Sequence, residues 1–203
     1  MKPVMLAAAV CAALSCACGP AVRVRSRDWQ GSGPALIFLA DRGEDEHVFD
    51  HLAPQFADRF HPMAVTSSGA DLDALAGELR GLLDAQKIET AHFVGAGFGA
   101  AEVLELARLA PDRIDSMVLI DPVDPARPVD FSVVRKPALA IFAAGQPGEQ
   151  GQLARRTAEA FAQQVPYGIV MFVQGPHRLH VERKADVVRE MNAFYNSGLQ
   201  QQP

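Results

Sequence analysis

Cysteine is almost absent from this sequence: all three of its cysteines fall within the first 18 positions, and none follows Cys18. The rest of the chain therefore has no disulfide, no thiol nucleophile and no cysteine-based metal site. Runs of Lys or Arg are also absent, because the net charge of -5 arises from interspersed acids and bases. A protein that binds nucleic acid needs several clustered cations to neutralise phosphates, so this composition argues against a nucleic-acid partner.

Long apolar runs are missing too, except at the N-terminus. Lys2 is followed by an almost uninterrupted apolar stretch from Pro3 to Ala17, which is too short for a permanent bilayer-spanning helix and is typical of a signal peptide. We therefore expect residues 1–18 to be removed on export. The residues before Cys16 and before Cys18 resemble a lipoprotein cleavage box, so we expect a lipid on one of these cysteines to hold the protein at the cell envelope. Plain secretion after Ala17, into the periplasm or beyond, is the alternative.

The remaining sequence fits one globular domain. Its 49% hydrophobic and 21% charged residues suit a chain that buries about 70% of its unfolded-state surface. No internal repeat is visible. We expect the domain to span residues 19–196 and a flexible tail to follow at 197–203.

Hydrophobic periodicity predicts alternating strands and helices. The alternation that starts at Ala21 predicts an edge strand, and the apolar run Ala35–Leu39 predicts its hairpin partner. Further strands are expected at 63–65, 92–94, 116–120, 137–143 and 169–173, and helices at 45–60, 71–86, 99–109, 153–165 and 181–195. This order predicts an α/β fold, a doubly wound and mostly parallel sheet with helices on both faces. The loops that begin at Ala40, Gly95, Asp121 and Gly175 should then meet at one sheet edge.

The segment after the strand at 92–94 carries a family resemblance. Gly95-Ala-Gly-Phe-Gly99 resembles the nucleophile elbow of the α/β-hydrolase fold superfamily, in which G-x-S-x-G joins a strand to a helix. Residues 28–39, 111–122 and 175–182 resemble other segments of that family, in the family's order. The resemblance implies an α/β-hydrolase fold over nearly the whole mature chain, and it implies that His177 matches the catalytic histidine.

Three positions depart from the family pattern. Gly97 stands where the family has its serine nucleophile, and it has no side chain to lift above the sheet. Asp41 stands where the family shows a His-Gly pair that leads to the oxyanion hole, and a carboxylate there would oppose a forming oxyanion. Residues 143–148 lack the expected acid, although Asp121 or Asp124 could substitute, because triads are defined by geometry.

A cap domain is also expected to be absent. Such a cap often follows the strand at 116–120, but only Val123–Arg135 precedes the next strand. We therefore expect an open, shallow pocket that cannot enclose a small ligand.

These departures predict impaired or lost hydrolase activity. The sequence favours a non-catalytic binding or scaffold protein of the envelope, with no cofactor or metal, whose partner is an unknown small molecule or an envelope protein. The alternative is an esterase-like hydrolase in which Thr66, Ser67 or Ser68 serves as a displaced nucleophile. Gly97→Ser alone is not expected to restore hydrolysis, because the acid and the oxyanion donors would still be missing.

Two motifs suggest other ligands. Residues 95–100 also fit G-x-G-x-x-A, and Asp121 closes the next strand where a ribose-binding acid would stand, so a dinucleotide-binding protein is a second alternative. The fingerprint is weak because it lies in mid-chain. His47 and His51, four residues apart and beside three acids, vaguely resemble a zinc motif, although a solvated first helical turn explains them as well.

Overall fold

The computed structural model describes residues 23–69, 71–126 and 128–197. The predicted leader with Cys16 and Cys18, and the tail from residue 198, lie outside these residues, so export, lipidation and the envelope location stay predictions. Within the described residues, no helix combines the length and the apolar character needed to cross a membrane.

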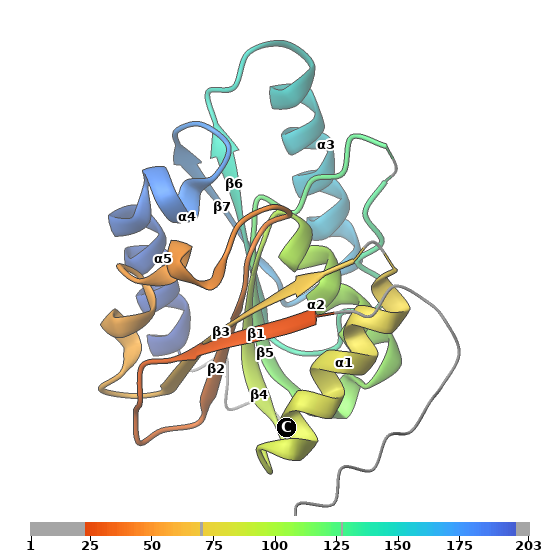
Figure 1. The fold of residues 1–203 in the computed structure, drawn as a ribbon. Helices are drawn as coiled ribbons and strands as arrows, with labels where there is room; N and C mark the ends of the chain where they lie inside the picture. The colour runs from red at the N-terminus through yellow and green to blue at the C-terminus, as the bar shows by residue number, and fades with distance from the viewer. Residues whose placement is uncertain (1–22, 70, 127, 198–203) are drawn as a thin grey trace, which may run out of the picture.

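A seven-stranded sheet forms the centre of the molecule (Figure 1). Its strand order is β1-β3-β2-β4-β5-β6-β7. β1 runs antiparallel to β3, and the other neighbouring pairs are parallel, which confirms the predicted α/β fold with a mostly parallel sheet. The strands are β1 (Arg23–Asp28), β2 (Ala35–Leu39), β3 (His61–Ser68), β4 (Ala91–Ala96), β5 (Ile114–Ile120), β6 (Ala138–Ala144) and β7 (Ile169–Gln174).

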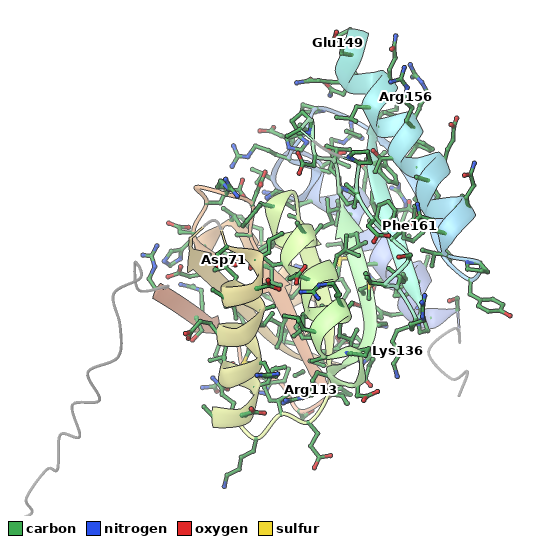
Figure 2. All side chains as sticks on the ribbon, turned by 90° about the vertical axis from the view of Figure 1, so that its right-hand side faces the viewer. Asp71, Arg113, Lys136, Glu149, Arg156 and Phe161 are labelled. Carbon is green, nitrogen blue, oxygen red and sulfur yellow. The ribbon has the colours of Figure 1, made fainter. Side chains whose placement is uncertain are left out.

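Helices cover both faces of this sheet. One face carries α1 (Leu72–Ala85), α2 (Phe98–Leu109) and α3 (Gly148–Gln164), and Figure 2 views this side, with Asp71 at the start of α1 and Phe161 on α3. The other face carries the short helices η1 (Glu46–Phe49), η2 (Ala53–Phe56) and α4 (Leu179–Glu182), together with α5 (Lys184–Asn196). A turn of 3-10 helix, η3 (Pro111–Arg113), joins α2 to β5.

The central strands are buried on both faces, which explains their uninterrupted apolar sequences. In β2, Leu36 and Phe38 pack toward the layer that contains α5, whereas Ile37 and Leu39 pack toward the layer of α1 and α2. All five residues of β2 are buried. A strand with two buried faces forms a rigid base, and the loops that follow it are held in fixed positions.

Several predicted elements differ from those in the structure. Ala35–Leu39 is not the hairpin partner of β1, because β1 pairs with β3 while β2 lies between β3 and β4. The fully apolar β2 is best buried in the interior, and the half-polar β1 suits an edge. The expected helix at 45–60 is two 3-10 turns, and Pro54, which has no N–H to donate, stands at the start of the second. The last helix is interrupted at Arg183, between α4 and α5.

The carboxyl ends of the parallel strands meet at one edge of the sheet, as expected. The loops after β2, β4, β5 and β7 carry Asp41, Gly97, Asp121 and His177, respectively, and side-chain contacts connect them. This edge holds the candidate site.

Candidate active site

Gly97 occupies a sharp turn between β4 and α2. Its backbone angles, φ 52° and ψ -114°, lie in a region that residues with side chains adopt only under strain. The Gly97 N–H donates to the carbonyl oxygen of Ile120 (2.9 Å), which fixes the turn against β5. The chain therefore keeps the strand-turn-helix geometry of a nucleophile elbow, with glycine at its apex.

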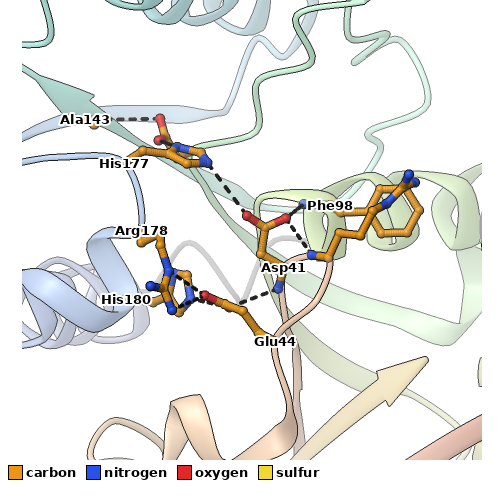
Figure 3. Close-up of polar contacts among 9 residues, drawn as sticks. Asp41, Glu44, Phe98, Ala143, His177, Arg178 and His180 are labelled. Carbon is orange, nitrogen blue, oxygen red and sulfur yellow. Dashed lines mark hydrogen bonds and ion pairs between the residues drawn. The ribbon is translucent and has the colours of Figure 1, made fainter. Parts of the chain in front are cut away.

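The carboxylate of Asp41 fills the space above this elbow (Figure 3). A Cβ atom added to Gly97 would lie 2.3 Å from Asp41 Cγ, so the carboxylate occupies the place where a nucleophile's side chain would project. Asp41 Oδ1 accepts hydrogen bonds from the backbone N–H groups of Phe98 (2.8 Å) and Arg42 (2.7 Å). Burial opposes ionisation of Asp41, but hydrogen bonds from His177 and these two amides outweigh it and lower its pKa.

His177 lies between two carboxylates. Its Nδ1 is hydrogen-bonded to Asp121 Oδ2, and its Nε2 lies 3.7 Å from Asp41 Oδ2. Hydrogen bonds to Asp121 and then to Asp41 outweigh the effect of burial and raise the pKa of His177 to about 10. At neutral pH, His177 is therefore an imidazolium that can donate a proton from Nε2.

Asp121 is the acid that the structure places on His177. Its side chain is only 5% exposed, and its Oδ1 accepts from the Ala143 N–H (3.3 Å), so the carboxylate is held from both sides. Its φ of 51° is unusual for a residue other than glycine, although Asp and Asn tolerate it better than most residues. Asp124, the other candidate, lies in a cavity wall, where its Oδ1 accepts from the Ala126 N–H (2.8 Å).

A second group of charged residues ties the Asp41 loop to the His177 loop. Glu44 Oε2 accepts from His180 Nε2 (2.7 Å), and Glu44 Oε1 accepts from Arg178 Nε (2.7 Å). The same carboxylate accepts from the Asp41 N–H (3.3 Å). Burial opposes ionisation of Glu44, but the contacts with His180 and Arg178 outweigh it and lower its pKa. Figure 3 shows this group beneath the pair of Asp41 and His177.

Glu44→Ala should therefore destabilise the fold and loosen the site. The substitution leaves His180, which is 2% exposed, without its acceptor, and we expect a loss of about 2 kcal/mol in the free energy of unfolding. For a chain of this size the melting temperature should fall by about 4–8 °C, measurable by circular dichroism. Glu159→Ala, an exposed change on α3, is the control and should have little effect. An unchanged melting temperature for Glu44→Ala would show that this group contributes nothing to stability.

Two cavities meet at His177. The larger, about 670 Å³, contains Asp41, Gly97 and Phe98 in its wall, and the smaller, about 160 Å³, contains Asp121 and Gln146. The described residues between β5 and β6 (121–126 and 128–137) form neither helix nor strand. An ester bound with its reacting carbon near His177 could therefore place its acyl and alcohol parts on opposite sides of the imidazole.

The other residues suggested by the sequence lie in different settings. Thr66 Oγ1 donates to Glu46 Oε2 (3.0 Å), and the side chains of Ser67 and Ser68 lie outside the described part of the chain. Asp121, which could have bound a ribose, contacts His177 instead. His47 Nδ1 lies 3.2 Å from Asp50 Oδ2. Across residues 23–69, 71–126 and 128–197, no group of three or more His, Cys, Asp or Glu side chains could hold a metal ion.

Sequence reasoning noticed Asp41 but missed its position, and it missed Glu44. It interpreted Asp41 as a defect of the oxyanion region. The sequence did contain a signal for the position of Asp41. Gly97 lacks the side chain of the elbow, and the loop that resembles the oxyanion segment carries a carboxylate at Asp41. These two departures from the family pattern are explained together if the Asp41 side chain replaces the one that is missing at Gly97. Nothing in the spacing connects Glu44 with His180, which are far apart in the sequence.

The geometry can be compared with known proteins. No family model matches this chain. Esterase YbfF of Escherichia coli (strain K12) is 34% identical over 142 residues, which are 66% of this chain and 54% of the esterase. The chain thus spans about half the length of this curated relative.

Solved structures extend the comparison at lower sequence identity. Carboxylesterase CesB (YbfK) from Bacillus subtilis superposes with a TM-score of 0.73 at 16% identity, covering 86% of this chain and 88% of that protein. A thermophilic esterase from Thermogutta terrifontis superposes with a TM-score of 0.74 at 12% identity, covering 87% and 94%.

These comparisons correct the functional prediction. The expectation of a non-catalytic binding or scaffold protein is wrong, because the curated relative is named an esterase and both structural neighbours are esterases. The esterase-like alternative fits these findings better. The structural neighbours share the fold of this chain. The chain has the α/β-hydrolase fold.

Proposed function

We propose that this protein hydrolyses ester bonds without a serine nucleophile, and that the carboxylate of Asp41 takes over the task of the missing side chain. One observation carries the proposal: Asp41 projects into the space above Gly97 and turns its Oδ2 toward His177 Nε2, 3.7 Å away. Because Oδ1 is anchored by two backbone N–H groups, Oδ2 is the oxygen that remains for chemistry.

In this proposal Asp41 acts as a general base. An ester lies in the larger cavity with a water molecule between its carbonyl carbon and Asp41 Oδ2. Asp41 takes one proton from the water as the oxygen attacks the carbonyl carbon and forms a tetrahedral intermediate. The His177 imidazolium then donates its Nε2 proton to the leaving alkoxide as the C–O bond breaks. Finally the proton on Asp41 passes to His177, so that one ester and one water give one acid and one alcohol.

The charges of the site support this division of roles. The low pKa of Asp41 keeps it ionised, and the pKa of His177, about 10, keeps the imidazole protonated at neutral pH. An imidazolium beside the reacting carbonyl also stabilises the oxyanion, a task for which the Phe98 N–H is not free because it binds Asp41. Asp121 holds the imidazolium in orientation through Nδ1.

Asp41→Asn tests the proposal most directly. Asparagine keeps an oxygen that can accept from Phe98 and Arg42 but removes the base, so kcat for short-chain 4-nitrophenyl esters should fall by about 10²–10³-fold. The exposed Asp58→Asn is the control and should retain the wild-type rate. The proposal fails if the unmodified protein does not hydrolyse these esters above the buffer rate, or if Asp41→Asn hydrolyses them as fast.

Isotope labelling tests whether Asp41 instead attacks the substrate to form an anhydride that water opens at the Asp41 carbonyl carbon. In a single turnover in H₂¹⁸O, a general base leaves the label in the product acid and none in the peptide that contains Asp41. Label in that peptide, detected by mass spectrometry, would mean that Asp41 attacked the substrate itself.

A further inference from the structure

Within the described part of the chain, Arg42 is a cation without a counter-charge in the wall of the larger cavity. Its guanidinium carbon lies 3.9 Å from the centre of the Phe98 ring, and both residues line the cavity. Among the described residues, no carboxylate forms an ion pair with the Arg42 side chain. Some other arginines are paired with carboxylates: Arg113 pairs with Asp84, and Arg178 pairs with Glu44.

The stacking on Phe98 prepares Arg42 to bind an anion. A guanidinium that lies over an aromatic ring uses its face for the contact and keeps its N–H groups available around the edge. Those N–H groups fit the two oxygens of a carboxylate. Because Phe98 is the first residue of α2, the backbone that carries the ring is held in place. The contact with this ring limits the conformations of the Arg42 side chain. Less conformational entropy is then lost when an anion binds.

The acids of the cavity do not neutralise this cation. Asp41 is engaged with two backbone N–H groups and faces the His177 imidazolium. Asp124 Oδ1 accepts from the Ala126 N–H. Elsewhere the wall is largely apolar, with Leu72, Ala101, Leu104 and Val129 among its residues.

We propose that Arg42 binds a carboxylate of the substrate, so that the preferred substrates are esters that carry a carboxylate at the end of an apolar chain. This inference rests on the proposed ester hydrolysis. The apolar wall accommodates the chain, and the edge of the stacked guanidinium binds the terminal carboxylate while the ester lies in the larger cavity beside Asp41 and His177.

A pair of esters that differ in one charge tests this selectivity. 4-Nitrophenyl hydrogen adipate and 4-nitrophenyl hexanoate share the six-carbon acyl chain and the leaving group. We expect kcat/KM to favour the adipate ester by about tenfold, the effect of about 1.4 kcal/mol, as one charge-assisted contact can provide. In Arg42→Gln the ratio of the two kcat/KM values should fall to about 1. Arg80→Gln, which removes the same charge from an exposed position on α1, should keep the tenfold ratio.

A binding measurement separates this inference from the proposed function. Adipic acid monoamide and hexanamide carry an amide in place of the ester, so their affinities can be measured by calorimetry without turnover. The monoamide should bind the unmodified protein about tenfold more tightly than hexanamide, and the two should bind Arg42→Gln equally. Equal affinities for the unmodified protein, or a preference that survives Arg42→Gln, would overturn the role of Arg42. Tight binding of the monoamide without ester turnover would refute the proposed hydrolysis and leave an Arg42 carboxylate site.

Discussion

The double variant Asp41→Gly with Gly97→Ser should become a serine hydrolase that reacts with a fluorophosphonate probe. The introduced serine would stand at the apex of the elbow, within the loops that hold His177 and Asp121. Removal of the Asp41 carboxylate also frees the N–H groups of Phe98 and Arg42, which point into the same space. Two such donors form an oxyanion hole, so the parts of a Ser-His-Asp site would be present together.

The single variant Gly97→Ser should not react with the fluorophosphonate probe. The new Cβ would lie 2.3 Å from Asp41 Cγ, and serine at φ 52° adds backbone strain, so we expect a destabilisation of about 2–3 kcal/mol. The sequence also predicts that this variant fails, but because the acid and the oxyanion donors are missing. The structure gives a different reason: Asp121 already contacts His177, and Asp41 blocks the site.

The rate of probe labelling, followed by intact-protein mass spectrometry, should therefore differ by about 10³–10⁴-fold between the double and the single variant. Asp41→Gly alone is one control and should not be labelled. Adding His177→Ala to the double variant is the second control and should abolish labelling. A reactive Gly97→Ser single variant would show that Asp41 does not obstruct the elbow.

Asp121→Asn should reduce kcat by about 10⁴-fold, as loss of the orienting carboxylate does in a serine triad. The Ala143 N–H donates to Asp121 Oδ1, so the asparagine should keep its oxygen there and point its NH₂ group at His177 Nδ1. The imidazole would then have to accept a hydrogen bond at Nδ1, and it would be neutral at pH 7. A neutral imidazole is a poor proton donor for a leaving alkoxide.

The pH profile adds a readout that misfolding would not reproduce. The pKa of His177 is raised to about 10, so the imidazolium persists at neutral pH. If the proposed hydrolysis holds, kcat of the unmodified protein should fall only as the pH passes through about 10. The hydrogen bond to Asp121 is the largest cause of the raised pKa of His177. Asp121→Asn removes the negative charge of this partner, so kcat of the variant should begin to fall at a lower pH. The exposed Asp112→Asn should keep both the rate and the profile. A residual activity of Asp121→Asn that keeps the wild-type profile would exclude Asp121 as the partner of His177.

The fold was largely predictable because its signals are local. The leucine stripe of α1, with Leu75, Leu79 and Leu83 buried, repeats with helical spacing, and the apolar runs of β2 and β5 predict buried strands. Pairing of the strands was less predictable. The hairpin of β1 and β2 was wrong, because the choice between two partners depends on which strand is buried in the finished sheet.

Some features of the candidate site were likewise predictable from the sequence, and others were not. The sequence by itself determined that Gly97 lacks a nucleophile, that His177 follows the last strand, and that the chain resembles α/β-hydrolases, since each of these depends on residues adjacent in the chain. Only the tertiary structure decided that Asp121 is the acid on His177, that Asp41 stands over Gly97, and that Glu44 binds His180. These contacts join loops from different strands. Side chains separated by tens of residues meet because parallel strands end at one edge, and local patterns carry no information about which of them touch.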